Sequence, residues 1–185
     1  MTRAVIIVED QFQDEEAVYS YHRMIEEGWT VEVATPSTRR KYGEIVNELP
    51  KVVYGKFGVP LKVTMPTEAL FVKDFDLVVI PGGFVSPDML RMRPEVLHFV
   101  GGMFADGKLV VLQCHGIWVG ISAGIMGLKN ATCYASLKDD LINAGGIYLD
   151  EPVVVDGNLI TSPHYRNNGD MMREVVKWIR QRGTI

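Results

Sequence analysis

Residues 109–120, Leu-Val-Val-Leu-Gln-Cys-His-Gly-Ile-Trp-Val-Gly, decide the fold of this chain. Apolar residues typical of a buried strand stop at Cys114, and small and apolar residues follow at helical spacing from Gly116 onward. A strand that turns sharply into a helix exposes the side chain at the turn and directs helix N–H groups toward it. Cys114 is therefore a candidate nucleophile, because a helix N-terminus favours the thiolate. The alternative is a buried core cysteine beside a chance histidine, which is the commoner situation.

Strands and helices are expected to alternate along the rest of the chain. The expected strands lie at residues 4–8, 29–34, 75–80, 109–113, 131–134, 153–155 and 159–161. The expected helices lie at residues 14–28, 94–106, 137–144 and 171–182, with a further helix directly after Cys114. This order predicts an α/β fold with a doubly wound, mostly parallel sheet sandwiched by helices. Ligands bind such sheets outside the carboxyl ends of the strands, where Cys114, Pro81-Gly82-Gly83 and residues 9–16 are expected to converge.

The length of 185 residues favours one domain over residues 1–185 with a sizeable core. Residues 36–59 are polar and interrupted by proline and glycine, so they are expected to form an inserted loop or a short β-hairpin. The segment is too short to hold a core of its own. It could cover the site or extend an interface between subunits.

The composition of the chain argues against some classes of binding partner. The net charge is −4, and no basic run extends beyond Arg39-Arg40-Lys41, which argues against nucleic acid and anionic membranes as partners. No stretch approaches the roughly 20 apolar residues of a membrane span. The chain contains two cysteines, which lie far apart, and no export signal is recognised, so a reduced, cytoplasmic protein is expected. No spacing of ligands predicts a metal site, and Cys133 is expected to be structural packing.

Several pieces of the chain together resemble the PfpI (ThiJ/PfpI) family of the class I glutamine amidotransferase-like superfamily. These pieces are Glu15-Glu16…Tyr21-His22-Arg23…Glu27-Gly28, Gly55-Lys-Phe-Gly58, Phe75–Gly83, Cys114-His-Gly116, Ile121–Gly124, Lys138–Gly145 and Val153–Asn158. The resemblance implies a flavodoxin-like α/β sandwich that forms homodimers or larger rings of dimers. It implies no cofactor and a small-molecule substrate. Members are described as cysteine peptidases or amidases, glyoxalases and deglycases, and more distant relatives as isonitrile hydratases; the fold alone does not choose among them.

The resemblance also assigns roles to four residues. The family's nucleophile falls on Cys114, and the acid that hydrogen-bonds the thiol falls on Glu16. A carboxyl beside a thiolate is expected to have a raised pKa and to donate or shuttle a proton. His115 is the family's neighbouring histidine, which a carboxylate of the partner subunit orients; here that carboxylate would be Asp88. The alternative for Glu16 is a first-turn acid that stabilises the helix dipole.

The glycines after the third strand are expected to serve the same site. The N–H groups of Gly83 and His115 would form the oxyanion hole, with Gly82 beside them. A plain turn is the alternative, because Pro-Gly-Gly alone is a weak signal.

The chain also departs from the family. Gln113 replaces an apolar residue before the cysteine, and Trp118 follows the turn. After the last strand, His164, Tyr165 and Arg166 are candidate substrate contacts, in place of the family's Ser-Arg-x-Pro segment. The alternative for these three is a polar loop that caps the last helix through Asn168. With Gln113, these three residues are expected to make the pocket more polar than the usual one.

Three functions remain open from the sequence. The first is a cysteine-nucleophile hydrolase or amidase that acts on a small carbonyl or amide substrate, and its runner-up is a glyoxalase III/deglycase or isonitrile-hydratase-like lyase with the same Cys-Glu pair. The second is a redox-sensing stress protein without turnover, in which Cys114 is oxidised to a sulfinic acid. The third is a plain ligand-binding or assembly module.

Overall fold

A seven-stranded sheet forms the centre of the part of the chain that the computed structural model describes, residues 1–41 and 44–182, with side chains described outside 39–46. The strand order is β12-β13-β9-β8-β1-β2-β7, and every neighbouring pair is parallel except β12–β13. The bounds are β1 (Arg3–Ile7), β2 (Thr30–Thr35), β7 (Met65–Pro66), β8 (Leu77–Ile80), β9 (Leu109–Gln113), β12 (Val154–Asp156) and β13 (Leu159–Ser162). The predicted mostly parallel, doubly wound sheet is confirmed.

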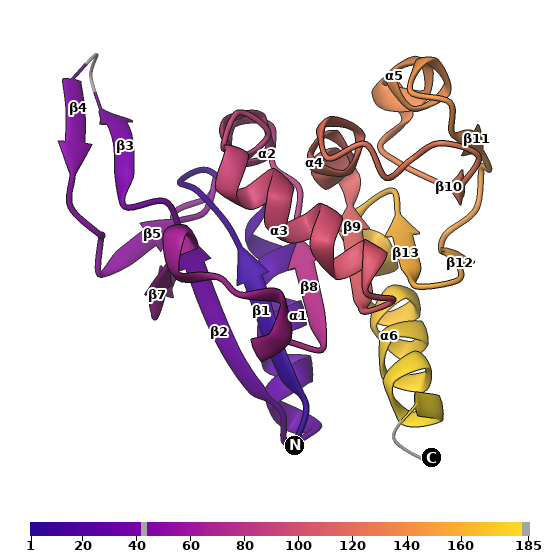
Figure 1. The fold of residues 1–185 in the computed structure, drawn as a ribbon, viewed down its shortest axis with the longest axis horizontal. Coiled ribbons are helices and arrows are strands. Elements are labelled where there is room, and N and C mark those ends of the chain that lie inside the picture. Colours follow the sequence, from indigo (N-terminus) through magenta and orange to yellow (C-terminus); the bar gives the residue numbers. More distant parts are fainter. Residues whose placement is uncertain (42–43, 183–185) are drawn as a thin grey trace.

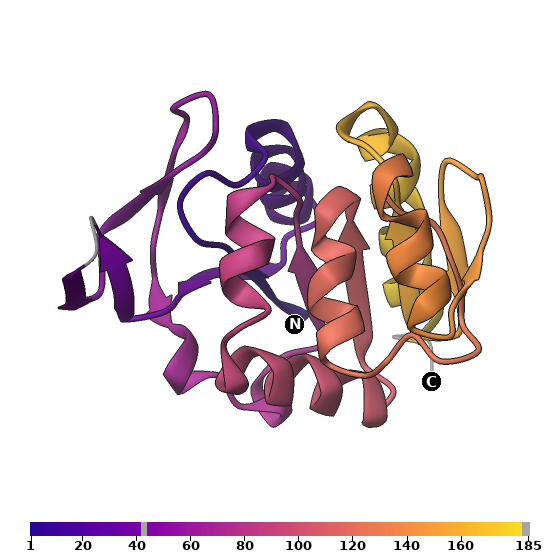
Figure 2. The same cartoon turned by 90° about the horizontal axis from the view of Figure 1, so that it is seen from above.

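Helices cover both faces of this sheet (Figures 1 and 2). One face carries α1 (Asp14–Glu26) and α6 (Asn168–Arg182), and the other carries α2 (Val85–Leu90), α3 (Pro94–Ala105) and α4 (Ile117–Ser122). Each face has its own apolar core, and β1 contributes to both: Val5 and Ile7 pack on one side, Ala4 and Ile6 on the other. This division explains the continuous apolar run of the strand, because side chains alternate between two buried faces.

A smaller unit, α5 (Lys138–Asn143) with β10 (Asn130–Ala131) and β11 (Ile147–Tyr148), lies beside β12 and β13 (Figure 1). The sequence predicted a strand over 131–134, whereas β10 has only two residues and ends at Ala131. It stays short because its only strand partner in the described chain, β11, is equally short.

The segment 36–59 contains more structure than the one loop or hairpin predicted. It begins with the hairpin of β3 (Thr38–Lys41) and β4 (Glu44–Asn47), which projects away from the sheet (Figure 1). A second antiparallel pair follows, β5 (Val52–Tyr54) with β6 (Pro60–Lys62), and its turn returns to the main body of the fold. The predicted short hairpin is therefore two hairpins, the second of which ends beyond residue 59.

Short helical turns complete the fold. They are 3-10 helices at Thr67–Ala69, Val72–Asp74, Cys114–Gly116, Ala135–Leu137 and Tyr165–Asn167. The sequence did not predict α2, whose six residues are too few to show a helical period. It also predicted the last helix from Met171, whereas α6 begins at Asn168.

In the described residues, no helix is both long enough and apolar enough to span a bilayer.

Candidate active site

Cys114 lies at the turn between β9 and α4, in a backbone conformation that is rare for this residue type. Its φ is 55°, in the left-handed region, where a residue with a side chain is strained by roughly 1–2 kcal/mol. Gly116 permits the tight turn, because a Cβ atom there would overlap the carbonyl oxygen of Ile80 on β8. The predicted sharp strand-to-helix turn is confirmed, and it leaves the Cys114 side chain 7% exposed at a pocket.

The two glycines after β8 let the backbone pass directly against the thiol. A Cβ atom on Gly82 would lie 2.6 Å from Cβ of Cys114 and 2.7 Å from Oε2 of Glu16. Gly83 has a φ of 88°, and a Cβ atom there would lie 2.5 Å from the backbone nitrogen of Gln13. The backbone N–H groups of Gly83 and His115 both hydrogen-bond the thiol and favour its ionised form. This pair of donors has the composition predicted for the oxyanion hole.

Glu16, in the first turn of α1, is fully buried beside Cys114. Its Oε2 accepts a hydrogen bond of 2.6 Å from the Gly82 N–H, while Oε1 has no hydrogen bond of normal geometry. Burial raises the pKa of this carboxyl to about 8, although hydrogen bonds from Gly82 and Cys114 act in the opposite direction. Glu16 is therefore mostly protonated at pH 7.

The thiol and the carboxyl titrate as a pair. Burial raises the pKa of Cys114, and the charge of an ionised Glu16 raises it further. Repulsion allows only one of the two groups to be ionised at a time. A protonated Glu16 removes this repulsion, and the N–H groups of Gly83 and His115 act to lower the pKa of the thiol, but burial keeps that pKa above its ordinary value. The resting Cys114 is therefore a thiol, in contrast to the thiolate that the helix N-terminus predicted, and ionisation of its sulfur belongs to the reaction with substrate.

His115 contacts its chain neighbour because of the unusual conformation of Cys114. Its Nδ1 lies 3.3 Å from the Cys114 Sγ. The imidazole stacks on Tyr134 with ring centroids 4.9 Å apart, and the Trp118 ring lies 5.2 Å away at 74°. Burial and the charge of Lys56 lower the pKa of His115, so the ring is neutral at pH 7. Within the described chain Asp88 makes no hydrogen bond to His115, because it lies exposed on α2.

These groups line one pocket of about 230 Å³ at the carboxyl ends of the strands. Its wall contains six of the residues that the sequence singled out, namely Glu16, Gly83, Cys114, His115, His164 and Tyr165. It also contains Gln13, Lys56, Phe57, Phe84 and Tyr134, which were not predicted as site residues.

Five predicted residues lie outside this wall. Gly82 lies behind the thiol, bonded to Glu16. Gln113 is fully buried and bonded to Asn168, as described below. Trp118 donates its indole N–H to Asp140, 2.8 Å away, and contacts the pocket wall through the rings of His115 and Phe84. Asp88 and Arg166 have exposed side chains.

Lys56 and Phe57 reach the pocket from the β5–β6 turn, which is bound to the start of α1. The buried carboxylate of Asp14 accepts hydrogen bonds from the N–H groups of Phe57 and Val59, both at 2.9 Å. Gly55 packs against the same carboxylate with no room for a side chain. The signal in the sequence was Gly55-Lys-Phe-Gly58, in which two glycines mark a tight turn around a cation and an aromatic ring.

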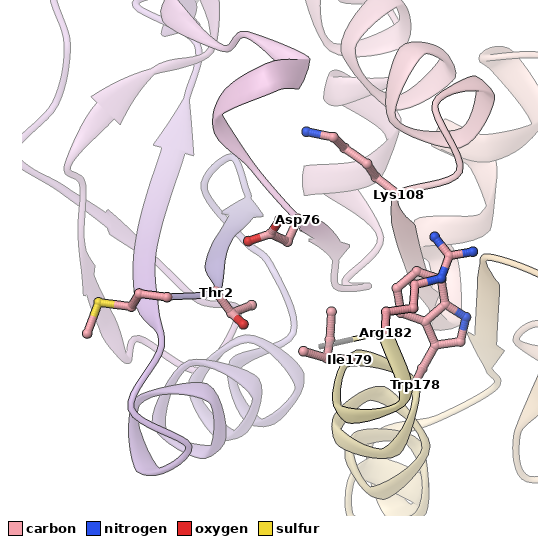
Figure 3. A pocket seen from close by; sticks show the side chains of 7 residues that line it. Thr2, Asp76, Lys108, Trp178, Ile179 and Arg182 are labelled. Carbon is pink, nitrogen blue, oxygen red and sulfur yellow. The ribbon is translucent and has the colours of Figure 1, made fainter. Parts of the chain in front are cut away.

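A second pocket, of about 330 Å³, lies at the opposite end of the sheet (Figure 3). Its charged groups bind the chain itself: Lys108 donates to the carbonyls of Val72 and Phe75, and Arg182 lies over the Trp178 ring. Neither cysteine nor histidine is among the residues that line it. Among the residues that the structure describes, no cluster of three or more His, Cys, Asp or Glu side chains could hold a metal ion.

The fold and the pocket together define a class: α/β proteins with a cysteine at a strand-to-helix turn beside a buried glutamic acid. Comparison with known proteins makes this class specific. The chain belongs to the DJ-1/PfpI family, whose model matches residues 2–178. The resemblance to the PfpI family is therefore confirmed, and so is the flavodoxin-like fold.

Named relatives cover nearly the whole chain. A deglycase of Pyrococcus abyssi is 39% identical over 96% of this chain and 99% of its own length. A putative cysteine protease of Bacillus subtilis is 36% identical over 86% of this chain and 88% of its own length. A solved two-domain protein of Anabaena variabilis, with DJ-1/ThiJ/PfpI-like and ferritin-like domains, matches with a TM-score of 0.87 at 30% identity. That match covers 97% of this chain and 48% of the two-domain chain. The relatives' names support an enzyme of the PfpI type.

Proposed function

We propose that this protein is a Cys114-dependent deglycase, which removes aldehyde-derived groups from amines by attack of the thiolate on carbon. The observation that carries the proposal is the meeting of Cys114, Glu16 and the Gly83 and His115 N–H groups at one pocket. The deglycase names of several archaeal relatives favour this reaction over the amidase reaction that the sequence analysis placed first.

The geometry supports a stepwise reaction. The Cys114 sulfur forms a bond to the carbonyl carbon of the substrate, and the electron pair of the C=O π bond moves to oxygen. The N–H groups of Gly83 and His115 stabilise that oxyanion. Neutral Glu16 then gives its proton to the oxygen and becomes a carboxylate. The carboxylate then accepts the proton of the neighbouring carbinol hydroxyl while the C–N bond breaks, and the departing amine takes up that proton as the carbinol carbon becomes an aldehyde. The C–S bond breaks last: the carbonyl re-forms, its hydroxyl proton returns to Glu16, and Cys114 and the dicarbonyl fragment are both freed.

The pocket suits a small carbonyl group. Its volume of about 230 Å³ equals that of roughly eight waters at about 30 Å³ each. Phe57 and Phe84, 71% and 62% exposed, stand at the mouth, where a larger amine-bearing molecule could remain outside. We therefore expect the carbon fragment to be small and the amine to be varied.

The test is the release of free amine from a preformed methylglyoxal adduct of an N-protected lysine, with free methylglyoxal removed beforehand. Wild type should release the amine, and both Cys114→Ala and Glu16→Gln should lose at least a hundredfold of the rate. Cys133→Ala is the matched control, because Cys133 is also buried, 1% exposed, and lies outside the pocket. Equal release by wild type and Cys114→Ala would exclude the proposal. Consumption of free methylglyoxal without amine release would indicate a glyoxalase instead.

An amidase reaction is the second candidate. The 3.3 Å contact between Cys114 Sγ and His115 Nδ1 supports it, since a Cys-His pair suits acyl transfer. The putative cysteine protease among the relatives points the same way. Hydrolysis of fluorogenic peptide amides that is lost in His115→Ala, with no amine release from glycated lysine, would establish this candidate in place of the first.

We also propose that the protein assembles with itself and that Asp88 of the partner subunit orients His115. The exposed position of Asp88 on α2 supports this arrangement. Mixing inactive Cys114→Ala with inactive Asp88→Asn should restore activity, because one site of a mixed dimer then has both groups. No restoration in a mixture shown to exchange subunits would refute a role for Asp88 across the interface.

A further inference from the structure

Gln113, the residue directly before the nucleophile, is a polar side chain in a fully buried position. It is 0% exposed and does not line the pocket, and its neighbours Leu109–Leu112 on β9 are all apolar. Its Oε1 has no hydrogen-bond partner in the described chain. A buried amide whose oxygen has no hydrogen-bond partner destabilises the fold, so stability alone does not account for Gln113.

The amide nitrogen of Gln113, in contrast to its oxygen, has two hydrogen-bond acceptors. Nε2 donates to Oδ1 of Asn168 at 2.7 Å and to the carbonyl oxygen of His164 at 3.2 Å. Asn168 is itself 7% exposed, and its Nδ2 donates to the carbonyl oxygen of Glu15 at 3.0 Å. Two amide side chains therefore connect β9, the loop after β13 and the first turn of α1.

Each of these three elements carries a wall of the pocket. Gln113 precedes Cys114, Glu15 precedes Glu16, and His164 lines the pocket itself. The bonded points thus lie within one residue of the groups that must meet. The first turn of α1 has other contacts as well: the Gln13 N–H donates to the Gly82 carbonyl at 2.9 Å, Asp14 accepts from the β5–β6 turn, and the Tyr165 backbone hydrogen-bonds Glu16.

We propose that Gln113 and Asn168 form a positioning relay that holds the Glu16 carboxyl against the Cys114 thiol and the His164–Tyr165 segment against the pocket. The relay takes Cys114 as the reacting group, as the proposed function does, but it does not depend on the substrate. Gln113 is a positioning residue here, since it does not touch the pocket.

A merely structural role, in which Asn168 caps α6, fits the contacts less well. The carboxamide of Asn168 is directed to Gln113 and Glu15, on other elements, at the start of its own helix. The carbonyl of His164 also accepts a 2.9 Å bond from the Asn167 N–H, so it keeps a partner without Gln113. Removal of both amides together therefore leaves no backbone carbonyl of the loop unpaired, and stability should change little.

The experiment measures the rate of Cys114 alkylation by iodoacetamide between pH 5 and pH 10, in a Cys133→Ala background so that one thiol reports. The variants are Gln113→Met, Asn168→Leu and the double variant, with Thr161→Val as the control. Thr161 is a fully buried residue on β13 that bonds the Thr132 N–H, away from the relay. The titratable groups that line the pocket, including Glu16, Lys56, His115 and His164, are unchanged in all of them.

We expect each relay variant to react about tenfold faster above pH 8, because a displaced Glu16 carboxylate no longer opposes ionisation of the Cys114 thiol. The profile should move toward the single step of an ordinary thiol near a pKa of about 8.5. The double variant should be no faster than the single ones, since both remove the same connection. Thr161→Val should keep the wild-type profile even where its urea midpoint falls.

Three results would overturn the relay: wild-type profiles in the single variants, additive rate changes in the double variant, or rate changes that follow urea midpoints across all variants including the control. Asn168→Asp keeps the acceptor for Gln113 and removes the donor to Glu15. It gives an independent reading if Gln113→Met does not fold, and a wild-type profile there would refute the α1 arm of the relay. Absence of deglycase activity in the wild type, with an alkylation profile that still changes in the relay variants, would count against the proposed function and not against the relay.

Discussion

The protonation of Glu16 makes a prediction about stability that needs no substrate. Its pKa is about 8 in the folded protein against a model value of 4.5, with burial as the main cause. A raised folded pKa contributes stability that is fully present below the unfolded pKa and is lost as pH rises through the folded pKa. The variant Glu16→Gln replaces the carboxyl by an amide that does not ionise. It should therefore not lose stability as the pH rises.

The magnitude follows from the two pKa values. Between pH 5 and pH 8 the unfolded carboxyl is ionised while the folded one is mostly protonated, and linkage gives a loss of about 3–4 kcal/mol over this interval. Glu16→Gln should flatten the dependence by that amount. Its advantage should be small at pH 5 and largest above pH 8.

Urea unfolding of wild type and Glu16→Gln at pH 5, 6, 7 and 8 measures this difference. Both proteins should carry Cys114→Ala, so that ionisation of the thiol does not contribute. The histidines His115 and His164 titrate in both and cancel in the comparison. Parallel pH profiles for the two proteins would show that Glu16 is already ionised in the folded state at pH 5, and the proton-transfer role assigned to it would fail.

Three further predictions concern the walls of the pocket. Gly83→Ala should lower the free energy of unfolding in urea by about 2–4 kcal/mol, since φ is 88° and the new Cβ atom would overlap backbone atoms. Gly58→Ala is the control: its φ is 87° but the space around it is open, so it should cost about 1 kcal/mol. Equal losses in the two variants would contradict the packing argument. Asp14→Ala should cost about 2–3 kcal/mol, because two part-buried N–H groups lose their charged acceptor, whereas Asp170→Ala on the surface should cost under about 0.5 kcal/mol. Lys56→Gln should lower the ratio of the iodoacetate to the iodoacetamide alkylation rate about threefold. The Lys56 ammonium attracts the iodoacetate carboxylate, and two unit charges about 7 Å apart in water interact by about 0.6 kcal/mol. An unchanged ratio would show that Lys56 does not act on the bound reagent.

The main sheet was predictable because its signals are local. Strands buried on both faces need continuous apolar runs, as in residues 4–8 and 109–113, and these runs mark β1 and β9 with little ambiguity. The weak points were short elements: α2 and β10 have six and two residues, too few for a period to show. Their positions are set by packing on longer elements, which a sequence pattern does not display.

The candidate site divides in the same way. Cys114 and Gly83 were found because a turn at a strand end concentrates its signal in a few neighbouring residues. Lys56 and Phe57 were missed because they arrive through Asp14, whose bonds to Phe57 and Val59 span 43 and 45 residues. Residues 55–58 alone give no sign that the Asp14 carboxylate accepts their hydrogen bonds.

Gln113 shows a subtler limit. A polar residue beside the nucleophile was interpreted as a pocket contact, but consecutive residues of a strand point to opposite faces. With Cys114 turned toward the pocket, the Gln113 side chain lies behind it, against Asn168. The alternation could have been applied to this pair, whereas the identity of the partner 55 residues away could not.

Backbone strain and a buried carboxyl are concentrated around the candidate active site. Two of the three non-glycine residues with positive φ in the described chain are Gln11 and Cys114, and both lie at the carboxyl edge of the sheet. The backbone of Gln11 packs against Gly83, and Cys114 packs against Gly82. Glu16 adds a buried carboxyl there, with one oxygen unpaired. Strain of this kind persists only when the surroundings determine it, and here two glycines, the Asp14-bound turn and the Gln113–Asn168 pair surround the thiol from separate sides. Since these supports come from different elements, loss of any one should loosen the site before it unfolds the protein.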